Sequence, residues 1–506
     1  MNNEGAVHKL ICYTCDMEKK FAAFLLPLVL IVAFLLRLVL INDSFWMDEA
    51  AQALESMRPL KEQLQISYDF QPPIFHLLVH VVSRFGSEEW WLRLASVIPG
   101  VITVWMTYLI SNELMKKKKW SAFAALLLAT SSFHIYFSQE LRQYALAAMF
   151  ASVSWFVILR MRKNPQLQQF VAFFVISLLG LYTMYVYGFL FLGQLFYLWF
   201  VYKEKRRLIV FGVFGMFLVY LPWIPMFLEQ IRIGTRLQSQ LPGWSSVVSA
   251  PQTIVLLHVV MRFIGGLQTF NQQWWEYAYF GVPCIVYTIL ILNYLRKHVL
   301  SEKFRVVFCW LLFPILSSWL FSFFLPVLSP KRVLFSLPAT YLLAALALEH
   351  LQVTWKKWLV MFMMSFQLLG VFLYWKSPSL QREDWRGIMT ELRDSLSVEN
   401  TIVVFGFYEP FAPWTYYEKM LGVKFATLAL ASERVVDAQR LDASLQTVLL
   451  YKNVLVLDYL RDLTDPERSI EAWLGKQGYQ EATIIPTRSI GFIRLFQKQI
   501  LYSFGK

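Results

Sequence analysis

Charged residues are scarce in this sequence. Asp, Glu, Lys and Arg make up only 16% of its 506 residues, whereas about a quarter is usual for a soluble domain. Cysteine is also rare, with four residues in the whole chain, which excludes a disulfide-stabilised scaffold. The 21 glycines and 20 prolines are too few for a collagen-like chain. What remains is a chain dominated by hydrophobic residues, which account for 57% of it and exclude disorder.

The hydrophobic residues are gathered into long blocks. A bilayer core needs roughly 20 mostly apolar residues per helix, because the backbone must satisfy its own hydrogen bonds there. The blocks that qualify are 21–41, 94–114, 120–136, 144–159, 170–182, 185–202, 208–228, 277–295, 306–328, 333–348 and 358–375. No charge separates the fifth block from the sixth, and we expect a tight turn near Thr183 between them. The sequence therefore predicts a polytopic α-helical membrane protein with about 11 transmembrane helices.

Lys and Arg exceed Asp and Glu in number, and the positions of the basic residues indicate how the chain is oriented in the membrane. If the N-terminus is cytoplasmic, short basic runs fall on the cytoplasmic side at every turn; these runs are 116–119, 160–163, 203–207, 296–305 and 356–357. This distribution is the positive-inside pattern. The surplus thus predicts a multi-pass protein of the cell (inner) membrane, with membrane lipids around it and no nucleic-acid partner.

Three segments are expected on the outer face: the loops 42–93 and 229–276, and everything from 376 onwards. The last segment has 16 basic and 16 acidic residues and only short apolar runs. Its patterns predict helices at 384–396 and 466–474 and strands at 401–407, 454–457 and 483–495. The predicted domains are therefore a cytoplasmic tail at 1–20, a membrane domain at 21–375 and an extracytoplasmic soluble α/β domain at 376–506.

The first outer loop carries most of the interesting acidic residues. Asp48 and Glu49 follow the first block almost at once, so we expect two carboxylates at the membrane surface, where a general base for a lipid-borne substrate is needed. The alternative is that Asp48 only caps the following helix. Further on, 74–82 is too short to cross and should form an interfacial helix. His76 and His80 have a spacing that suits a metal but lack an obvious third ligand.

Other polar residues are predicted at the outer ends of the spans. They are Glu140, Arg142 and Tyr144 in one short turn, Lys331 and Arg332 in another, and Arg37 near the end of the first block. Arginine binds phosphate through two parallel hydrogen bonds, which stabilises charge on a leaving group. The set therefore suits a reaction that releases an anionic phosphate, although snorkelling to the surface is an alternative for Arg37. Cys12 and Cys15 form a single CxxC, which alone does not define a metal site.

Several strings in the first 150 residues resemble one family. They are Trp46-Met47-Asp48-Glu49-Ala50 after Arg37, then Gln71-Pro72-Pro73-Ile74-Phe75, Trp91-Leu92-Arg93-Leu94-Ala95-Ser96, and Phe133 to Leu146 with its Ser138-Gln139-Glu140-Leu141-Arg142-Gln143-Tyr144 core. In order and spacing these strings resemble the GT-C class of membrane glycosyltransferases, in particular the bacterial relatives of protein O-mannosyltransferases and aminoarabinose transferases. Lys331-Arg332 resembles a later motif of the family more loosely.

The resemblance implies a reaction and a set of roles. The donor would be a sugar on a polyprenyl (undecaprenyl or dolichyl) phosphate, and Asp48, with Glu49 beside it, would deprotonate an acceptor hydroxyl with inversion at the sugar. Glu140 would help to shape the site. The donor phosphate would be held by Arg142, Lys331, Arg332 and Arg37, and the substrate loop would contain Gln71, Pro72, Pro73 and Tyr144.

One departure from the family pattern limits the assignment. Aminoarabinose transferases have Glu-Lys before the Pro-Pro step, whereas Gln71 stands there in this chain, so the sequence does not predict an aminoarabinose transferase. The sugar (hexosyl or pentosyl) and the acceptor (protein, lipid or glycan) stay open. A divalent cation is possible but not required. The alternatives are a flippase or transporter of lipid-linked sugars, and an O-antigen polymerase or ligase.

Overall fold

The chain divides into two compact units. The computed structural model describes residues 25–240, 252–267, 273–406, 411–430, 441–459, 461–488 and 490–498; the Cys12–Cys15 motif lies outside them. Unit 1 comprises Met1–Ile41, Gln63–Phe227 and Ser249–Lys376, and unit 2 comprises Asn42–Glu62, Leu228–Val248 and Ser377–Lys506. The last segment of unit 2 begins beside the boundary that we expected at 376. The difference is that the first part of the outer loop, which carries Asp48 and Glu49, belongs to unit 2.

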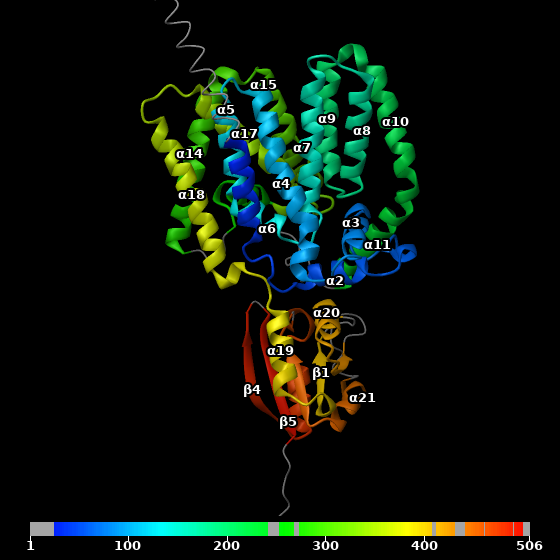
Figure 1. Ribbon diagram of the computed structural model, residues 1–506. Helices are drawn as coiled ribbons and strands as arrows, with labels where there is room; N and C mark the ends of the chain where they lie inside the picture. Colours follow the sequence, from blue (N-terminus) through cyan, green and yellow to red (C-terminus); the bar gives the residue numbers. More distant parts are fainter. Residues whose placement is uncertain are drawn as a thin grey trace, which may run out of the picture. The chain divides into compact units, whose positions relative to one another are not determined.

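Unit 1 is helical. Its helices are Leu25–Leu38, α3 (Ile74–Val82), α4 (Glu89–Leu114), α5 (Lys118–Ala129), α6 (Ser132–Ser138), α7 (Tyr144–Met161), α8 (Leu167–Leu181), α9 (Tyr187–Val201), α10 (Arg206–Tyr220), α13 (Val255–Gly265), α14 (Trp274–His298), α15 (Glu302–Val307), α16 (Phe313–Phe321), α17 (Leu337–His350) and α18 (Lys356–Lys376) (Figure 1). Helix α11 (Ile224–Gln240) begins in unit 1, and its larger part belongs to unit 2. Each of the predicted apolar blocks contains a helix.

The number of helices that could cross a membrane is smaller than predicted. Among the described residues, seven helical stretches are long and apolar enough, or eight if α5 and α6 form one bent span. The helix Leu25–Leu38, α8 and α9 are apolar but shorter. The break between α8 and α9 falls where we expected a turn, near Thr183. The structure thus confirms a multi-span helical architecture, whereas the count of about 11 stays a prediction.

The prediction of a single helix for the block 120–136 is wrong. The block breaks after α5, and α6 continues at an angle of 62°. Thr130 Oγ1 donates to the carbonyl of Leu126 (2.8 Å), and the Ser131 side chain accepts from the backbone N–H of His134 (3.4 Å). Hydroxyl side chains compete in this way with the helical hydrogen-bond ladder. A hydropathy average does not register such a break, because the polar residues Thr130, Ser131, Ser132 and His134 are flanked by strongly apolar stretches.

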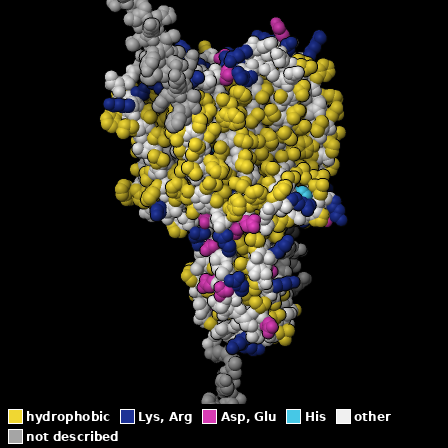
Figure 2. Space-filling view, in the orientation of Figure 1, with side chains coloured by type: hydrophobic (Ala, Val, Ile, Leu, Met, Phe, Trp, Pro, Cys, Tyr) yellow, Lys and Arg dark blue, Asp and Glu magenta, His cyan; other side chains and the backbone are white. Residues whose placement is uncertain are grey.

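The helices of unit 1 differ in how far they are buried. The stretch Lys331–His350, which contains α17, is the most enclosed of the seven candidate spans: 89% of its most apolar 18 residues are buried. Helix α17 packs on α5 and α14. In α14 and α18, by contrast, only 28% of the most apolar 18 residues are buried. On the face shown in Figure 2, hydrophobic side chains cover the middle of unit 1, and charged side chains gather at its ends. This distribution is that of a protein surrounded by lipid.

Unit 2 contains the predicted α/β domain. Its sheet has the strand order β2-β1-β3-β5-β4, with β1 (Thr401–Phe405), β2 (Ala426–Ala429), β3 (Asn453–Leu457), β4 (Tyr479–Thr487) and β5 (Gly491–Lys498). The first three are parallel, and β5 joins β3 and β4 in antiparallel pairs. Strands β1 and β3 are buried along their whole length, as their continuous apolar sequences require.

The helices of unit 2 are α2 (Met47–Ser56), α19 (Trp385–Ser395), α20 (Ala412–Leu421), α21 (Leu441–Leu445), α22 (Arg461–Thr464) and α23 (Ser469–Lys476). Helix α19 confirms the helix predicted at 384–396: the Asp384 side chain caps it by accepting from the backbone N–H of Gly387 (3.1 Å). Strand β2 and helix α20 were not predicted. Helix α2 packs against α20, although the two are more than 350 residues apart in the sequence.

Candidate functional site

Asp48 and Glu49 lie in the first turn of α2, where the helix dipole favours negative charge. Their surroundings differ sharply. Glu49 is completely buried, and its Oε2 atom lies 3.4 Å from Nε of Arg382, which is 3% exposed. Asp48 is half-buried, and its carboxylate makes no hydrogen bond or ion pair with any residue that the structure describes. Of the two carboxylates, that of Asp48 is therefore the more exposed one, and it has no such partner within the described part of the chain.

The segment that leads into α2 is tied to the rest of unit 2 by hydrogen bonds. The backbone N–H of Phe45 donates to the hydroxyl of Tyr417 (2.7 Å), and Ser44 Oγ donates to the carbonyl oxygen of Glu383 (2.6 Å). Together with the ion pair between Glu49 and Arg382, these contacts fix the start of α2 on the C-terminal part of the chain.

Glu383 is a carboxyl beside Asp48 that the sequence analysis missed as a site residue. It accepts hydrogen bonds from Tyr459 Oη (3.0 Å), from Trp385 Nε1 (2.7 Å) and from the backbone N–H of Met47. Burial raises the pKa of Glu383 to about 7; the three hydrogen bonds oppose this shift, and the charge of Asp48 adds to it. The charged string that begins at Arg382, directly after the last span, was the available signal.

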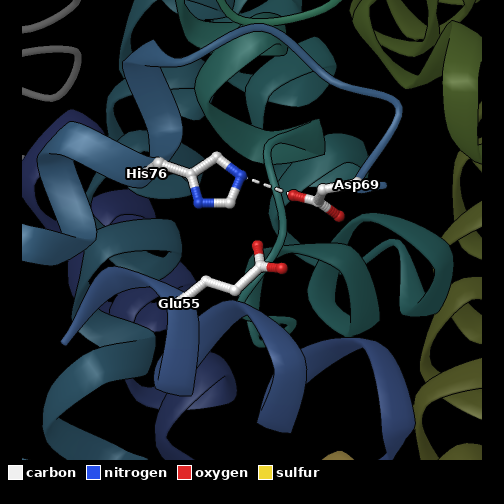
Figure 3. A group of neighbouring side chains, drawn as sticks. All are labelled: Glu55, Asp69 and His76. Carbon is white, nitrogen blue, oxygen red and sulfur yellow. Dashed lines mark hydrogen bonds and ion pairs between the residues drawn. The ribbon is translucent and has the colours of Figure 1, made fainter. Parts of the chain in front are cut away.

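A second polar cluster lies in unit 1, around Asp69 (Figure 3). His76 Nε2 lies 2.5 Å from Asp69 Oδ2, and Arg142 Nη1 donates to Asp69 Oδ1 (2.9 Å). The side-chain amide of Gln71 contacts both Asp69 and His76. The cluster thus joins two residues of the predicted site, Gln71 and Arg142, through two residues that the sequence analysis did not place there.

The charge of Asp69 is compensated inside this cluster. Burial alone would raise the pKa of Asp69, but Arg142 above all, and then His76, lower it to well below its usual range. Asp69 and His76 are side chains of the kind that ligate divalent metals. Arg142, however, places a positive charge on the same carboxylate. His80, which shares the metal-compatible spacing with His76, has its Nε2 atom 3.2 Å from Nη2 of Arg84.

Tyr144 and Lys331 meet at the start of α7. The ammonium of Lys331 lies 5.7 Å from the centre of the Tyr144 ring, and η5 (Lys331–Ser336) packs along α7. Arg332 is half-buried, and its Nη1 atom donates to the carbonyls of Pro326 (3.1 Å) and Val327 (3.3 Å). Glu140 is buried in the turn before α7. The structure therefore brings Lys331 and Arg332 to the helix that follows Arg142.

Arg37 is buried completely within unit 1. Its guanidinium donates to the carbonyls of Ala33 (2.7 Å) and Ala129 (3.3 Å), and Nη2 lies 2.6 Å from His134 Nδ1. These contacts differ from the snorkelling to the surface that we considered for Arg37. Pro72 and Pro73 are buried at the start of α3, where Ile74 donates its backbone N–H to the carbonyl of Tyr182 (3.1 Å).

A unit of apolar helices and a small α/β unit are what the resemblance to the GT-C class led us to expect. Residues 71–226 match the family model described as Dolichyl-phosphate-mannose-protein mannosyltransferase. No curated protein sequence matches the chain.

Solved structures extend the likeness over nearly the whole chain. ArnT from Cupriavidus metallidurans in the apo state matches with a TM-score of 0.58 at 13% identity, over 94% of this chain and 98% of that chain. The same protein bound to undecaprenyl phosphate matches with a TM-score of 0.57 at 13% identity, over 94% and 98%. The archaeal oligosaccharyltransferase AglB from Archaeoglobus fulgidus, in complex with an inhibitory peptide and a dolichol-phosphate, matches with a TM-score of 0.53 at 11% identity, over 94% of this chain and 74% of that chain. The GT-C fold that we expected from the sequence is therefore confirmed.

Proposed function

We propose that this protein is a membrane glycosyltransferase that transfers a sugar from a polyprenyl-phosphate donor to an acceptor hydroxyl on the outer face of the membrane. The observation that carries the proposal is the fold, which extends over 94% of the chain in common with a protein solved with undecaprenyl phosphate. The open carboxylate of Asp48 at the start of α2 gives this fold a chemically suitable base. The same likeness favours a transferase over a flippase of lipid-linked sugars, since AglB is named an oligosaccharyltransferase.

In the proposed reaction, Asp48 takes the proton of the acceptor hydroxyl. The hydroxyl oxygen attacks the anomeric carbon from the face opposite to the phosphate, and the bond between the anomeric carbon and the phosphate oxygen breaks. The electron pair stays on the leaving lipid phosphate. Because the attack comes from the opposite face, the configuration at the anomeric carbon is inverted. Lys331 and Arg332, with Arg142 and Arg37, are the proposed phosphate ligands, because cations stabilise the charge that develops there.

The remaining predicted residues have supporting roles in this proposal. Glu49 holds α2 through its ion pair with Arg382, and Glu140 shapes the turn before α7. Gln71, Pro72, Pro73 and Tyr144 form the substrate loop.

The activity can be tested on the purified protein in lipid nanodiscs. Undecaprenyl-phosphate mannose serves as a hexosyl donor and undecaprenyl-phosphate arabinose as a pentosyl donor, and release of undecaprenyl phosphate is measured with peptide, lipid A and glycan acceptors. Mass spectrometry of surface glycans and glycoproteins in a deletion strain would then identify the natural product. A deletion strain with unchanged glycans and glycoproteins would contradict the proposal.

Arg332→Ala should weaken the use of the lipid-phosphate donor roughly ten- to hundred-fold, because a hydrogen bond to a charged group contributes about 1.5–3 kcal/mol. The measurement is the donor KM, with Arg332→Lys as the control that keeps the charge and should lose less. If the acceptor KM changed and the donor KM did not, Arg332 would have no phosphate role.

We also propose that the N-terminus is cytoplasmic and that the α/β part of unit 2 is extracytoplasmic, on the basis of the basic runs. A cysteine introduced at the exposed residue Asp462 should then react with a membrane-impermeant maleimide in intact cells. The background is a variant without the four native cysteines. If labelling required lysis of the cells, the α/β part would be cytoplasmic and the proposed topology would be wrong.

A further inference from the structure

The C-terminal part of the chain makes several contacts with the start of α2. The carboxyl group of Glu383 has three hydrogen-bond donors from three places: Trp385 at the start of α19, Tyr459 after β3, and the backbone N–H of Met47. Met47 is the first residue of α2. The first N–H groups of a helix have no partner within it, and the N-cap residue of α2 supplies no side-chain hydrogen bond. Glu383 therefore caps α2 from a distant part of the sequence.

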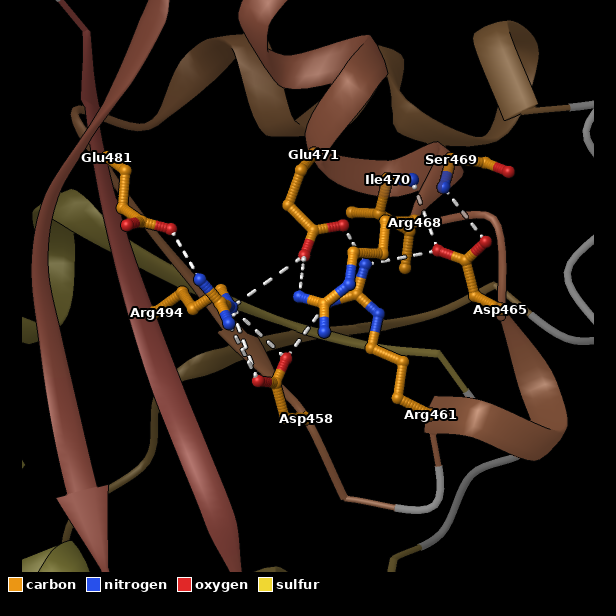
Figure 4. A network of polar contacts seen from close by, with 9 residues as sticks. All are labelled: Asp458, Arg461, Asp465, Arg468, Ser469, Ile470, Glu471, Glu481 and Arg494. Carbon is orange, nitrogen blue, oxygen red and sulfur yellow. Dashed lines mark hydrogen bonds and ion pairs between the residues drawn. The ribbon is translucent and has the colours of Figure 1, made fainter.

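A network of ion pairs and hydrogen bonds surrounds Asp458 (Figure 4). Asp458, the residue before Tyr459, accepts from Arg494 Nη2 (3.1 Å) and from Arg461 Nη1 (3.3 Å). Arg461 also donates to Asp465 (3.1 Å), which in turn caps α23 through the backbone N–H groups of Ser469 and Ile470. This network holds Asp458 next to Tyr459, whose hydroxyl donates to Glu383.

The order of the strands places a topological switch point between β1 and β3. From β1 the chain goes to β2 on one side and later to β3 on the other, so the carboxyl ends of β1 and β3 form the switch point at which open α/β sheets bind their ligands. Tyr459 follows β3 at that edge. Its ring lies 5.6 Å from that of Trp385 and 5.4 Å from that of Phe411. The carboxyl of Glu383 thus lies beside a group of aromatic rings.

We propose that Glu383 is a positioning residue for Asp48, which caps the helix that carries Asp48 and adds a second negative charge beside it when it loses its proton. This inference rests on the proposed function. The titratable groups that act on Glu383 are Asp48 on α2 and Tyr459 after β3. Its neighbours in the chain have other partners: Arg382 pairs with Glu49, and Asp384 caps α19. When Glu383 is protonated, Asp48 has one negative neighbour fewer. When Glu383 is ionised, its charge favours transfer of the acceptor proton to Asp48 and strengthens the cap on α2.

The test uses Glu383→Gln, which has nearly the same shape and no charge. The amide oxygen can still accept from Trp385 and Met47, and the Tyr459 hydroxyl can rotate to accept from the amide nitrogen, so the variant should fold. For the wild type we expect kcat to rise between pH 6 and pH 8, with an inflection near the pKa of Glu383, about 7. Glu383→Gln should lose this inflection. In the wild type, the hydrogen bond from Tyr459 lowers the pKa of Glu383. Tyr459→Phe removes this bond, so the pKa and the inflection should move to higher pH.

A second measurement needs no substrate. The pKa of folded Glu383 lies above the ordinary value of 4.5, so the folded protein binds more protons than the unfolded chain between pH 4.5 and about 7. Stability should therefore fall with rising pH across that range and level off above it. Thermal unfolding of the wild type should show this fall, and Glu383→Gln should show a smaller one.

The outcomes separate the two proposals. An inflection that persists in Glu383→Gln, with kcat equal to that of the wild type, would overturn the role of Glu383 while leaving the transferase intact. A wild-type protein that releases undecaprenyl phosphate from neither donor would count against the proposed function. In that case an equal decline of stability in the wild type and in Glu383→Gln would also overturn the placement of Glu383.

Discussion

Asp48→Asn should lower the rate of sugar transfer by about a hundred-fold or more, since general bases typically contribute 10²–10⁴-fold. The substitution keeps the size of the side chain and removes its ability to take a proton. Asp48 makes no hydrogen bond or ion pair within the described part of the chain, so the exchange breaks no such contact. We therefore expect kcat to fall while expression, thermal stability and binding of undecaprenyl phosphate stay close to those of the wild type.

A matched control for this variant is Glu62→Gln. Glu62 is an acid of the same outer loop, in the short turn Leu60–Glu62 that follows α2, and it makes no ion pair with another described residue. It should transfer sugar at the wild-type rate. Turnover of Asp48→Asn within a few-fold of the wild type would exclude Asp48 as the base. Equal losses in both variants would point to the charge of the loop rather than to a single base.

The sequence predicted the helices of unit 1 well because the membrane leaves few alternatives. A backbone without water must satisfy its own hydrogen bonds, so each long apolar block becomes a helix. The break between α5 and α6 was missed, because it depends on hydroxyl groups at Thr130 and Ser131 that compete with the helical ladder. Hydropathy averages over a window and does not report such local competition.

The candidate site was predictable only in part, for a different reason. Asp48, Gln71 and Arg142 could be found because they stand in short strings that resemble a family. The partners of these residues could not, because they come from distant parts of the chain: Asp69 reaches Arg142 across 73 positions, and Glu383 reaches the start of α2 across more than 300. No local pattern encodes such pairs. They become visible only when the fold brings the segments together.

The same long-range contacts make Arg382 a residue whose loss should lower the stability of unit 2 substantially. Arg382 and Glu49 form an ion pair in which the side chains are 3% and 0% exposed. Removal of one partner of a buried pair leaves an uncompensated charge and costs about 3–5 kcal/mol. In a unit of this size, 1 kcal/mol shifts the melting temperature by about 2–4 °C, so Arg382→Ala should melt roughly 6–20 °C below the wild type.

Two further variants decide whether the buried charge is the cause. Arg393→Ala removes an arginine of α19 that pairs only with its exposed neighbour Asp394 among the described residues, and it should melt like the wild type. The double variant Arg382→Met with Glu49→Met replaces both charges by apolar side chains and should recover most of the lost stability, because the desolvation cost disappears with the pair. A double variant as unstable as Arg382→Ala would mean that α2 is held by the shape of the two side chains and not by their charges. Since Asp48 lies on α2, recovered stability without recovered transfer would show that the pair also orients the base.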